Sequence, residues 1–331
     1  MRSLNDMGEF GFIDRLARII PSSPTVVEGI GDDCAVLRVG ERLVLVSTDM
    51  FIEDVHFRRE GVSPRDIGWK AASACLSDIA AMGGAPLYCL TSLACPGDET
   101  AVFLEEIYRG MLSAMSRYGA VIVGGDTTRS PRGIIIDVIA VGEAIGGHFL
   151  RRRGAKVGDV LVVTGSLGCS AAGLHALTHG NSCGELVQAH MYPSPRILEG
   201  QWLCTRESVH AMIDISDGLC QDAGHLAKAV RLGVDLYPER LPVTPALAQY
   251  CAEHGLDPVQ LMLSGGEDYE LLFAADAKNV DKAMEAFHHE FRLPTTVIGT
   301  VTDEWTGVRT NGQIPPREGF DHFKPQTPEN S

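Results

Sequence analysis

The amino-acid sequence predicts a two-domain α/β protein, and three observations carry that prediction. The chain has 331 residues, which is more than one hydrophobic core usually serves. Its 45% hydrophobic and 21% charged residues are close to the averages of folded globular proteins. Short apolar runs of strand length alternate with longer helix-like segments along both halves, which is the pattern of α/β folds.

The first half of the chain alternates predicted strands with predicted helices. The strand-like runs are residues 42–49, 86–95, 120–126 and 133–144, and the helical segments are residues 65–83 and 99–118. A loop rich in Arg and Gly follows at residues 146–159, and a second α/β series then begins with VLVVTGSLGCSAAGLHAL. We therefore predict an N-terminal domain of residues 1–147 and a C-terminal domain of residues 148–331.

The second series continues to the end of the folded chain. Its apolar runs lie in residues 160–177, 211–230, 263–275 and 295–302. Several of these runs end at an acidic residue, and so do several runs of the first half. In open α/β folds ligands bind at the carboxyl ends of strands, so these acids are candidates for a site.

One predicted helix carries an acid where its core face should be. Residues 65–83 place Ile67, Ala71, Cys75 and Met82 on one stripe at helical spacing, and Asp78 falls in the middle of it. A carboxylate centred on an apolar helix face must be paired or must line a site. The helix at 99–118 has an ordinary apolar stripe and is predicted to serve the core alone.

Charge and cysteine usage exclude several classes of function. With 43 acidic against 28 basic residues the formal charge is −15, which argues against a nucleic-acid partner. No apolar run reaches the roughly 18 residues of a membrane span. The N-terminus carries acids where a signal peptide would be apolar, so we expect a cytoplasmic protein without membrane partners. The nine cysteines form no Cys-x-x-Cys pair and are expected to be reduced core residues.

The acids at strand ends are the main functional signal. Asp32 and Asp33 are adjacent in VEGIGDDCAVL, and further acids follow apolar runs at Asp49, Asp126, Asp214, Asp217, Glu267 and Asp268. Each one alone could cap a helix or close a turn. If they converge, two carboxylates about 4 Å apart repel by about 4 kcal/mol at an effective dielectric of 20. Divalent cations would remove that cost, and oxygen ligands without His or Cys select Mg²⁺.

Carboxylates, Mg²⁺ and glycine turns together suggest a nucleoside triphosphate as ligand. The sequence has no G-x-x-x-x-G-K-[ST], and TGSLGCSAAG lacks both that lysine and the G-x-G-x-x-G spacing. The catalytic-loop motifs of protein kinases are also absent. Any nucleotide site must therefore be of another type.

The segments that carry the acids read, in chain order, GIGDDCAVL, STDMFIEDVHF, LSDIAAMGG, VGGDTT, RRRGAKVGD with VTGSLGCSAAGL, IDISDGL and SGGEDYELLF. This ordered set resembles the thiamine-monophosphate kinases, whose superfamily also includes aminoimidazole ribonucleotide synthetases, selenophosphate synthetases and a hydrogenase-maturation protein. The resemblance implies a two-domain aminoimidazole ribonucleotide synthetase-like fold. It also implies a homodimer whose N-terminal domains close into a β-barrel, and ATP bound with several Mg²⁺ ions; K⁺ is a further candidate ion.

Matching the motifs residue by residue gives a candidate site. The resemblance implies metal positions at Asp33, Ser47, Thr48, Asp49, Asp78, Asp126, Asp214 and Asp217. Among these, Asp49, Asp78, Asp126 and Asp217 are the candidate catalytic residues, whereas Asp32 is expected to orient the turn. The implied ATP contacts are Gly125, Asp126, Arg152 and Ser216, and the implied thiamine-phosphate contacts are His56, Glu267 and Phe320. The family usually has a larger aromatic residue where Phe320 stands, and a phenyl ring keeps the stacking face without a polar handle.

The reaction implied by the resemblance moves the γ-phosphoryl group of ATP onto thiamine monophosphate. A phosphate monoester has its second pKa near 6, so the acceptor is already largely anionic at neutral pH and needs no strong general base. We therefore predict direct transfer without a phosphoenzyme. Three alternatives stay open: a ribonucleotide synthetase, a selenophosphate synthetase and a non-catalytic divalent-ion-binding dimer. A selenophosphate synthetase would be expected to have a reactive cysteine near its N-terminus, whereas the first cysteine here is Cys34.

Overall fold

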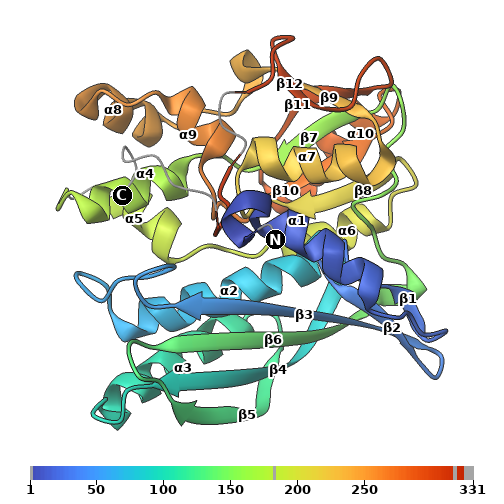
Figure 1. Cartoon of the computed structure of the whole chain (residues 1–331). Helices are drawn as coiled ribbons and strands as arrows, with labels where there is room; N and C mark the ends of the chain where they lie inside the picture. The colour runs from blue at the N-terminus through green and yellow to red at the C-terminus, as the bar shows by residue number, and fades with distance from the viewer. Residues whose placement is uncertain (1–2, 182–183, 316–318, 324–331) are drawn as a thin grey trace.

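A computed structural model of the chain describes residues 3–181, 184–315 and 319–323. Two α/β units lie one above the other, each built around its own sheet, with helix α2 (Pro64–Ala81) between them (Figure 1). The prediction of a two-domain α/β protein is confirmed. The described cysteines are all free thiols. No helix in the described ranges combines the length and the hydropathy that crossing a bilayer would require.

The N-terminal unit contains one six-stranded sheet in the order β1-β2-β3-β6-β4-β5. Only β4 and β5 pair in parallel; the other neighbours are antiparallel. Its elements are α1 (Leu4–Ile19), β1 (Val26–Glu28), β2 (Ala35–Val39), β3 (Arg42–Ile52), α2, β4 (Gly84–Cys95), α3 (Ala101–Ser116), β5 (Val121–Arg129), β6 (Ile135–Ala144) and the short 3₁₀ helix η1 (Ile145–Gly147).

The C-terminal unit contains a second six-stranded sheet, in the order β12-β9-β11-β7-β10-β8. Its elements are β7 (Val160–Thr164), α4 (Cys169–Thr178), α5 (Gly184–Met191), α6 (Ile197–Cys204), β8 (Val209–Asp214), α7 (Leu219–Val230), β9 (Gly233–Leu236), η2 (Pro238–Arg240), α8 (Pro245–His254), α9 (Pro258–Ser264), β10 (Leu271–Ala275), α10 (Val280–Phe291), β11 (Thr295–Thr302) and β12 (Gly307–Thr310). Strand β8 is an edge strand and contacts α2 of the other unit.

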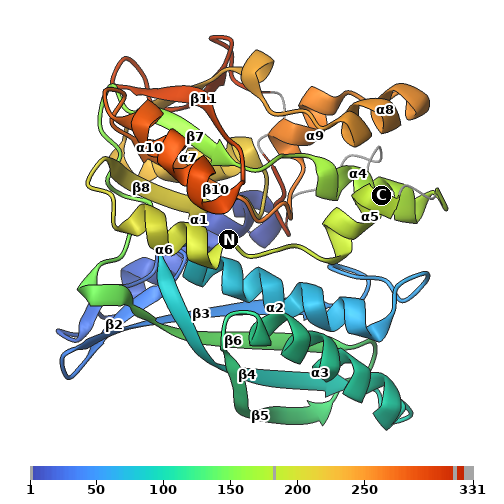
Figure 2. The same ribbon diagram turned by 180° about the vertical axis from the view of Figure 1, so that it is seen from behind.

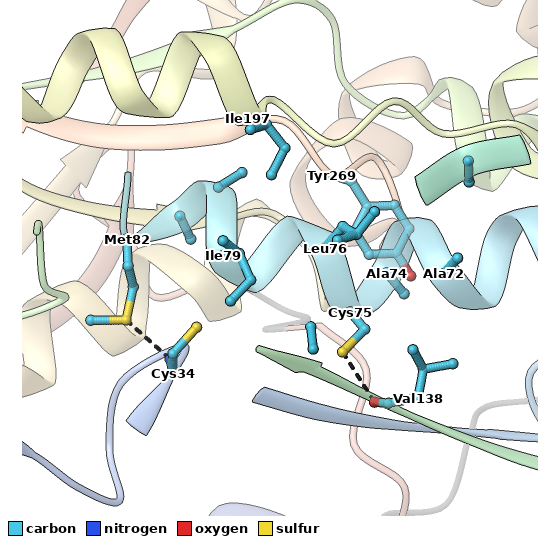
Figure 3. Packing of buried hydrophobic residues seen from close by; sticks show 14 of the residues in the cluster. Cys34, Ala72, Ala74, Cys75, Leu76, Ile79, Met82, Val138, Ile197 and Tyr269 are labelled. Atoms are coloured by element: carbon cyan, nitrogen blue, oxygen red, sulfur yellow. Dashed lines mark hydrogen bonds between the residues drawn. The ribbon is translucent and has the colours of Figure 1, made fainter. Parts of the chain in front are cut away.

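Helix α2 joins the two units. It begins with a capping box, in which Ser63 and Asp66 satisfy each other's backbone N–H groups, and has Pro64 at its first position. The sequence predicts one apolar stripe, but α2 is buried nearly all round. Figure 3 shows the reason: Cys75 lies toward Val138 of the N-terminal sheet, whereas Ile197 and Tyr269 of the C-terminal unit lie on the other side. A helix packed on both sides loses its polar face.

The two faces of the N-terminal sheet differ. Helices α2 and α3 cover one face, as Figure 2 shows, and no described element covers the other. The uncovered face exposes large apolar side chains from β3, β4 and β5, namely Met50, Tyr88, Leu90, Val121 and Val123. Within one chain the described strands form an open sheet and no closed barrel. We call this uncovered surface the open face.

Candidate active site

The adjacent acids Asp32 and Asp33 have different environments. Asp32 Oδ1 accepts hydrogen bonds from the backbone N–H groups of Asp33 and Arg152, both at 3.1 Å, as expected of a residue that orients the turn. Asp33 Oδ1 accepts two bonds from the Arg152 guanidinium, from Nη2 at 2.6 Å and Nε at 3.1 Å. Asp33 Oδ2 is buried and has no hydrogen-bond partner among the described residues.

Three aspartates from separate parts of the chain, one of them Asp33, converge here. One ligand oxygen from each of Asp33, Asp78 and Asp214 lies within 4.8 Å of the others. Asp33 precedes β2, Asp78 lies on α2, and Asp214 ends β8, so the group spans both units. Strand β8 of the C-terminal unit contacts α2, so the carboxyl end of β8 places Asp214 near Asp78.

Strand β3 adds two more polar side chains to the same group. Ser47 and Asp49 alternate with exposed residues and lie on the face that α2 covers. The Ser47 hydroxyl donates a hydrogen bond to Asp78 Oδ2. The charge of Asp217 raises the pKa of Asp49, and the charge of Asp49 raises that of Asp78, each in addition to burial. Asp217 therefore borders the same group.

The electrostatics of this carboxylate group match a site for hard cations. Burial raises the pKa of Asp214 to about 7, helped by the charge of Asp33. Burial likewise raises the pKa of Asp49 to about 6, helped by Asp217, and the pKa of Asp217 to about 6. The pKa of Asp78 lies well above its ordinary value for the same reasons. An unpartnered buried oxygen in an oxygen-only donor set therefore fits Mg²⁺.

The raised pKa of Asp214 predicts a pH-dependent loss of stability in EDTA. The folded-state pKa lies above the unfolded value of 3.8, so the stability contributed by the protonated carboxyl is complete below pH 3.8, falls as the pH rises from there, and is lost as the pH passes through 7. Between pH 6 and 8 the free energy of unfolding of the wild type should fall by about 1 kcal/mol more than that of Asp214→Asn. Urea denaturation at both pH values measures this; equal changes in the two proteins would contradict it.

The open face holds a second set of predicted residues. On this face the Thr48 hydroxyl donates a hydrogen bond to Asp137 Oδ1 at 2.7 Å. In the strand register, Ser92 of β4 lies between Asp126 of β5 and Asp137 of β6. Gly125 precedes Asp126 on the edge strand β5. The structure therefore does not bring Thr48 and Asp126 to the Asp33, Asp78 and Asp214 group. Asp137 was missed from sequence because it lies inside an apolar run rather than at its end.

The turn between β8 and α7 carries Ser216 and Asp217. A single carboxylate oxygen, Asp222 Oδ2, accepts hydrogen bonds from the backbone N–H groups of Ser216, Asp217 and Gly218 at 3.1–3.2 Å. Asp222 is buried and holds this turn in shape. From sequence it reads only as an acid in the first helical turn, so its role could not be assigned.

The predicted substrate residues His56 and Phe320 lie close together, with His322 between them. The His322 ring centroid is 5.0 Å from that of His56 and 4.8 Å from that of Phe320. Burial and the neighbouring His322 lower the pKa of His56 to about 4, so its ring is neutral. Because Nδ1 accepts from the Ile52 N–H at 3.1 Å, the ring proton is on Nε2. His56 is therefore a neutral donor beside an aromatic ring.

The same region contains the acids of SGGED. Glu267 has a left-handed backbone with φ of 64°, and its N–H donates to the Ser216 carbonyl at 2.8 Å. The neighbouring Asp268 faces away and accepts from the backbone N–H groups of Gly168 and Ser170, at 2.7 and 3.1 Å. Phe320 is tied to the same turn, since its N–H donates to the Asp217 carbonyl at 3.0 Å. The substrate-side residues thus adjoin the carboxylate group.

A cavity of about 400 Å³ lies between α3 and strands β4 and β5. Its lining includes Leu93, Leu104, Tyr108 and Thr127. Thr127 comes directly after Gly125 and Asp126 on β5. From sequence Tyr108 is not a candidate site residue, because it belongs to an ordinary amphipathic helix pattern.

Comparisons with known proteins agree with this architecture. The family model described as "AIR synthase related protein, N-terminal domain" matches residues 31–144, and that of the "C-terminal domain" matches residues 156–310. The chain is 35% identical to the thiamine-monophosphate kinase of Aquifex aeolicus over 97% of this chain and 99% of the relative. It is 37% identical to that of Escherichia coli K12, over 96% and 98%.

The chain is also similar to solved structures. AaThiL complexed with AMPPCP and TMP superimposes with a TM-score of 0.87 at 35% identity, over 97% of this chain and 99% of that one. The E. coli hydrogenase maturation protein HypE shares the fold at 24% identity, with a TM-score of 0.67. The resemblance predicted from the motifs is confirmed, and the chain belongs to the thiamine-monophosphate kinase family of AIR synthase related proteins.

Proposed function

We propose that this chain transfers the γ-phosphoryl group of ATP to thiamine monophosphate, giving thiamine diphosphate and ADP. The observation that carries the proposal is the convergence of Asp33, Asp78 and Asp214 from both units, together with a buried oxygen of Asp33 that has no hydrogen-bond partner among the described residues. Family membership agrees with it, since the relatives are named thiamine-monophosphate kinases and one is solved with AMPPCP and TMP.

The proposed metal-binding residues fall into two groups. Asp33, Ser47, Asp49, Asp78, Asp214 and Asp217 would hold Mg²⁺ at the boundary between the units. Thr48 and Asp126, with Asp137, would form a further position on the open face. Bound Mg²⁺ supplies neutralisation of phosphate charge and a template for in-line transfer. K⁺ stays a prediction.

The chain's own residues position the two substrates. The Arg152 guanidinium lies at Asp33, where it can bind a phosphate bidentately once a cation replaces it as the partner of that carboxylate. Neutral His56 can donate its Nε2 proton to the acceptor phosphate. No strong general base is needed for an anionic acceptor, so we propose direct transfer without a phosphoenzyme.

We place the nucleotide along β5 and Arg152, with Gly125 and Ser216 as backbone and hydroxyl contacts. The cavity lined by Tyr108 and Leu104 lies on the side of this edge strand that α3 covers, opposite to Asp126, and offers an aromatic and aliphatic surface for the base. Glu267 and Phe320 then remain for the thiamine moiety, the carboxylate for its positive charge and the phenyl ring for stacking.

This division of the site predicts separate effects on the two Michaelis constants. Glu267→Gln should raise KM for thiamine monophosphate by about tenfold or more, because a charge-assisted contact of about 1.5 kcal/mol or more is lost. Its KM for ATP should change less than about twofold. Tyr108→Ala should raise KM for ATP and leave KM for thiamine monophosphate nearly unchanged. Steady-state kinetics with each substrate varied in turn measure both, and equal effects on the two constants would contradict the placement.

We further propose a cytoplasmic homodimer that buries the open face of the N-terminal sheet. A second copy is the proposed partner because Met50, Tyr88 and Leu90, with Val121 and Val123, form an apolar surface there, and edge strand β5 has free hydrogen-bonding groups. Two such sheets facing each other could close into the barrel predicted above. Sedimentation should give a dimer for the wild type and a shift toward monomer for Leu90→Asp; an unchanged dimer would contradict this interface.

The activity is tested by incubating the protein with Mg-ATP and thiamine monophosphate. Thiamine diphosphate should form in a one-to-one ratio with ADP, and no radiolabel from [γ-³²P]ATP should remain on the protein as a competent intermediate. ADP without thiamine diphosphate would favour another ATP-using member of the superfamily. The absence of both products would favour the non-catalytic ion-binding dimer.

A further inference from the structure

Helix α2 carries a lysine whose side chain is almost completely removed from solvent. Lys70 is 1% exposed and is among the largest fully buried side chains of the described residues. An isolated buried ammonium is costly and persists only when it is paired. Its Nζ atom lies 2.8 Å from Glu267 Oε2 and 2.9 Å from His190 Nε2, so it connects the N-terminal α2 to two segments of the C-terminal unit.

The histidine behind Lys70 is neutral. Burial, and next the charge of Lys70, lower the pKa of His190 to about 3. Since Nε2 accepts a hydrogen bond from the ammonium, the ring proton is on Nδ1, where it donates to Ser170 Oγ at 3.0 Å. Lys70 is therefore held by a neutral ring, and Ser170 fixes the tautomer of that ring.

Glu267 is held from two directions. Its backbone is fixed to the Ser216 carbonyl in a left-handed conformation, and its Oε2 atom accepts from Lys70. Its Oε1 atom accepts no hydrogen bond from the described part of the chain, and the side chain is 27% exposed. One oxygen is thus committed to Lys70, and His56 lies close enough to act electrostatically on the carboxylate.

We propose that Lys70 is a positioning residue for the thiamine-phosphate site: it fixes the orientation and the ionised state of Glu267 through a chain that runs from Ser170 and His190. This inference rests on the proposed role of Glu267 toward the substrate cation. The charge of Lys70 is the largest influence that opposes the effect of burial on Glu267 and lowers the pKa of that carboxyl. Without it, burial alone would favour the protonated acid.

The test measures kcat and both Michaelis constants from pH 5.5 to 8.5 for the wild type, Lys70→Met, Glu267→Gln and the double variant. Lys70→Met should raise KM for thiamine monophosphate about tenfold, a change of about 1.4 kcal/mol, and leave KM for ATP within about twofold. The increase should grow as the pH falls, because Glu267 then takes up a proton. The other titratable groups that face Glu267, His56 and His190, are neutral across this range.

The double variant separates positioning from a structural role. If Lys70 acts through Glu267, Lys70→Met should add little to the defect of Glu267→Gln. Lys228→Met is the matched control, since Lys228 forms an exposed pair with Asp14 and should leave both KM values unchanged. Additive losses, or a Lys70→Met defect that is confined to kcat and independent of pH, would overturn the proposal.

Two further measurements keep the outcome decisive. If Lys70→Met does not fold, Ser170→Ala removes the acceptor of the His190 proton and should raise KM for thiamine monophosphate about threefold, in the same direction and with KM for ATP unchanged. An unchanged KM in Ser170→Ala would then overturn the proposal. Wild-type turnover of thiamine monophosphate is the separate control, because its absence would refute the proposed function rather than the role of Lys70.

Discussion

Asp49→Ala should lower kcat by about 100-fold or more, because a residue that holds a catalytic cation contributes several kcal/mol of transition-state stabilisation. Asp49 lies on β3 beside Asp78, and burial, followed by the charges of Asp217 and Asp137, already raises its pKa. The substitution therefore removes repulsion as well as contacts. In EDTA the thermal transition should stay close to that of the wild type.

The control for Asp49→Ala is Asp98→Ala, which changes an exposed carboxylate in the turn before α3. It should keep wild-type turnover and wild-type dependence on Mg²⁺. Initial rates over a range of Mg²⁺ concentrations measure both variants. Wild-type activity of Asp49→Ala at saturating Mg²⁺ would show that this carboxylate does not hold the cation.

Arg152→Met should produce the largest loss of stability in EDTA, about 3 kcal/mol near pH 7.5. Removing one partner of a buried ion pair typically costs this much, because the other charge is left unpaired. The carboxylate of Asp33 would lose both of its hydrogen bonds, and its pKa is already raised by burial. The loss should be smaller at pH 5, where Asp33 can be protonated, and Mg²⁺ should restore part of it.

Arg153→Met is the matched control, because Arg153 is 57% exposed and pairs with Glu28. An exposed pair of this kind contributes less than about 1 kcal/mol. Urea denaturation with and without Mg²⁺ compares the two variants, and KM for ATP should rise only in Arg152→Met. Equal stability losses in the two variants would mean that the arginine run is a surface feature.

Much of the fold could be predicted from sequence because strand and helix periods are local. The apolar runs at residues 42–49 and 86–95 became β3 and β4, and Asp49 at the end of the first run lies beside Asp78. The double-sided burial of α2 could not be predicted, because it depends on the C-terminal unit packing against its second side. The sequence predicts a single apolar stripe on this helix. The burial of Lys70 could not be predicted either, because it also depends on contacts with the C-terminal unit.

The motifs alone do not show that the candidate residues lie on two faces of the sheet. Thr48 and Asp49 are neighbours in sequence, yet the alternation of β3 puts them on opposite faces. Asp126 points to the open face, because it pairs with Ser92 and Ser92 pairs with Asp137 on that face. The role of Asp222 depends on backbone N–H groups whose directions exist only in the folded turn.

The most direct test of the central claim is a crystal structure of the protein with Mn²⁺ and a non-hydrolysable ATP analogue, with the anomalous signal of manganese measured. We expect a manganese peak coordinated by Asp33, Asp78 and Asp214, with the analogue's phosphates and Arg152 beside it. A bound analogue whose manganese peaks all lie away from these three carboxylates would refute the proposed cation site.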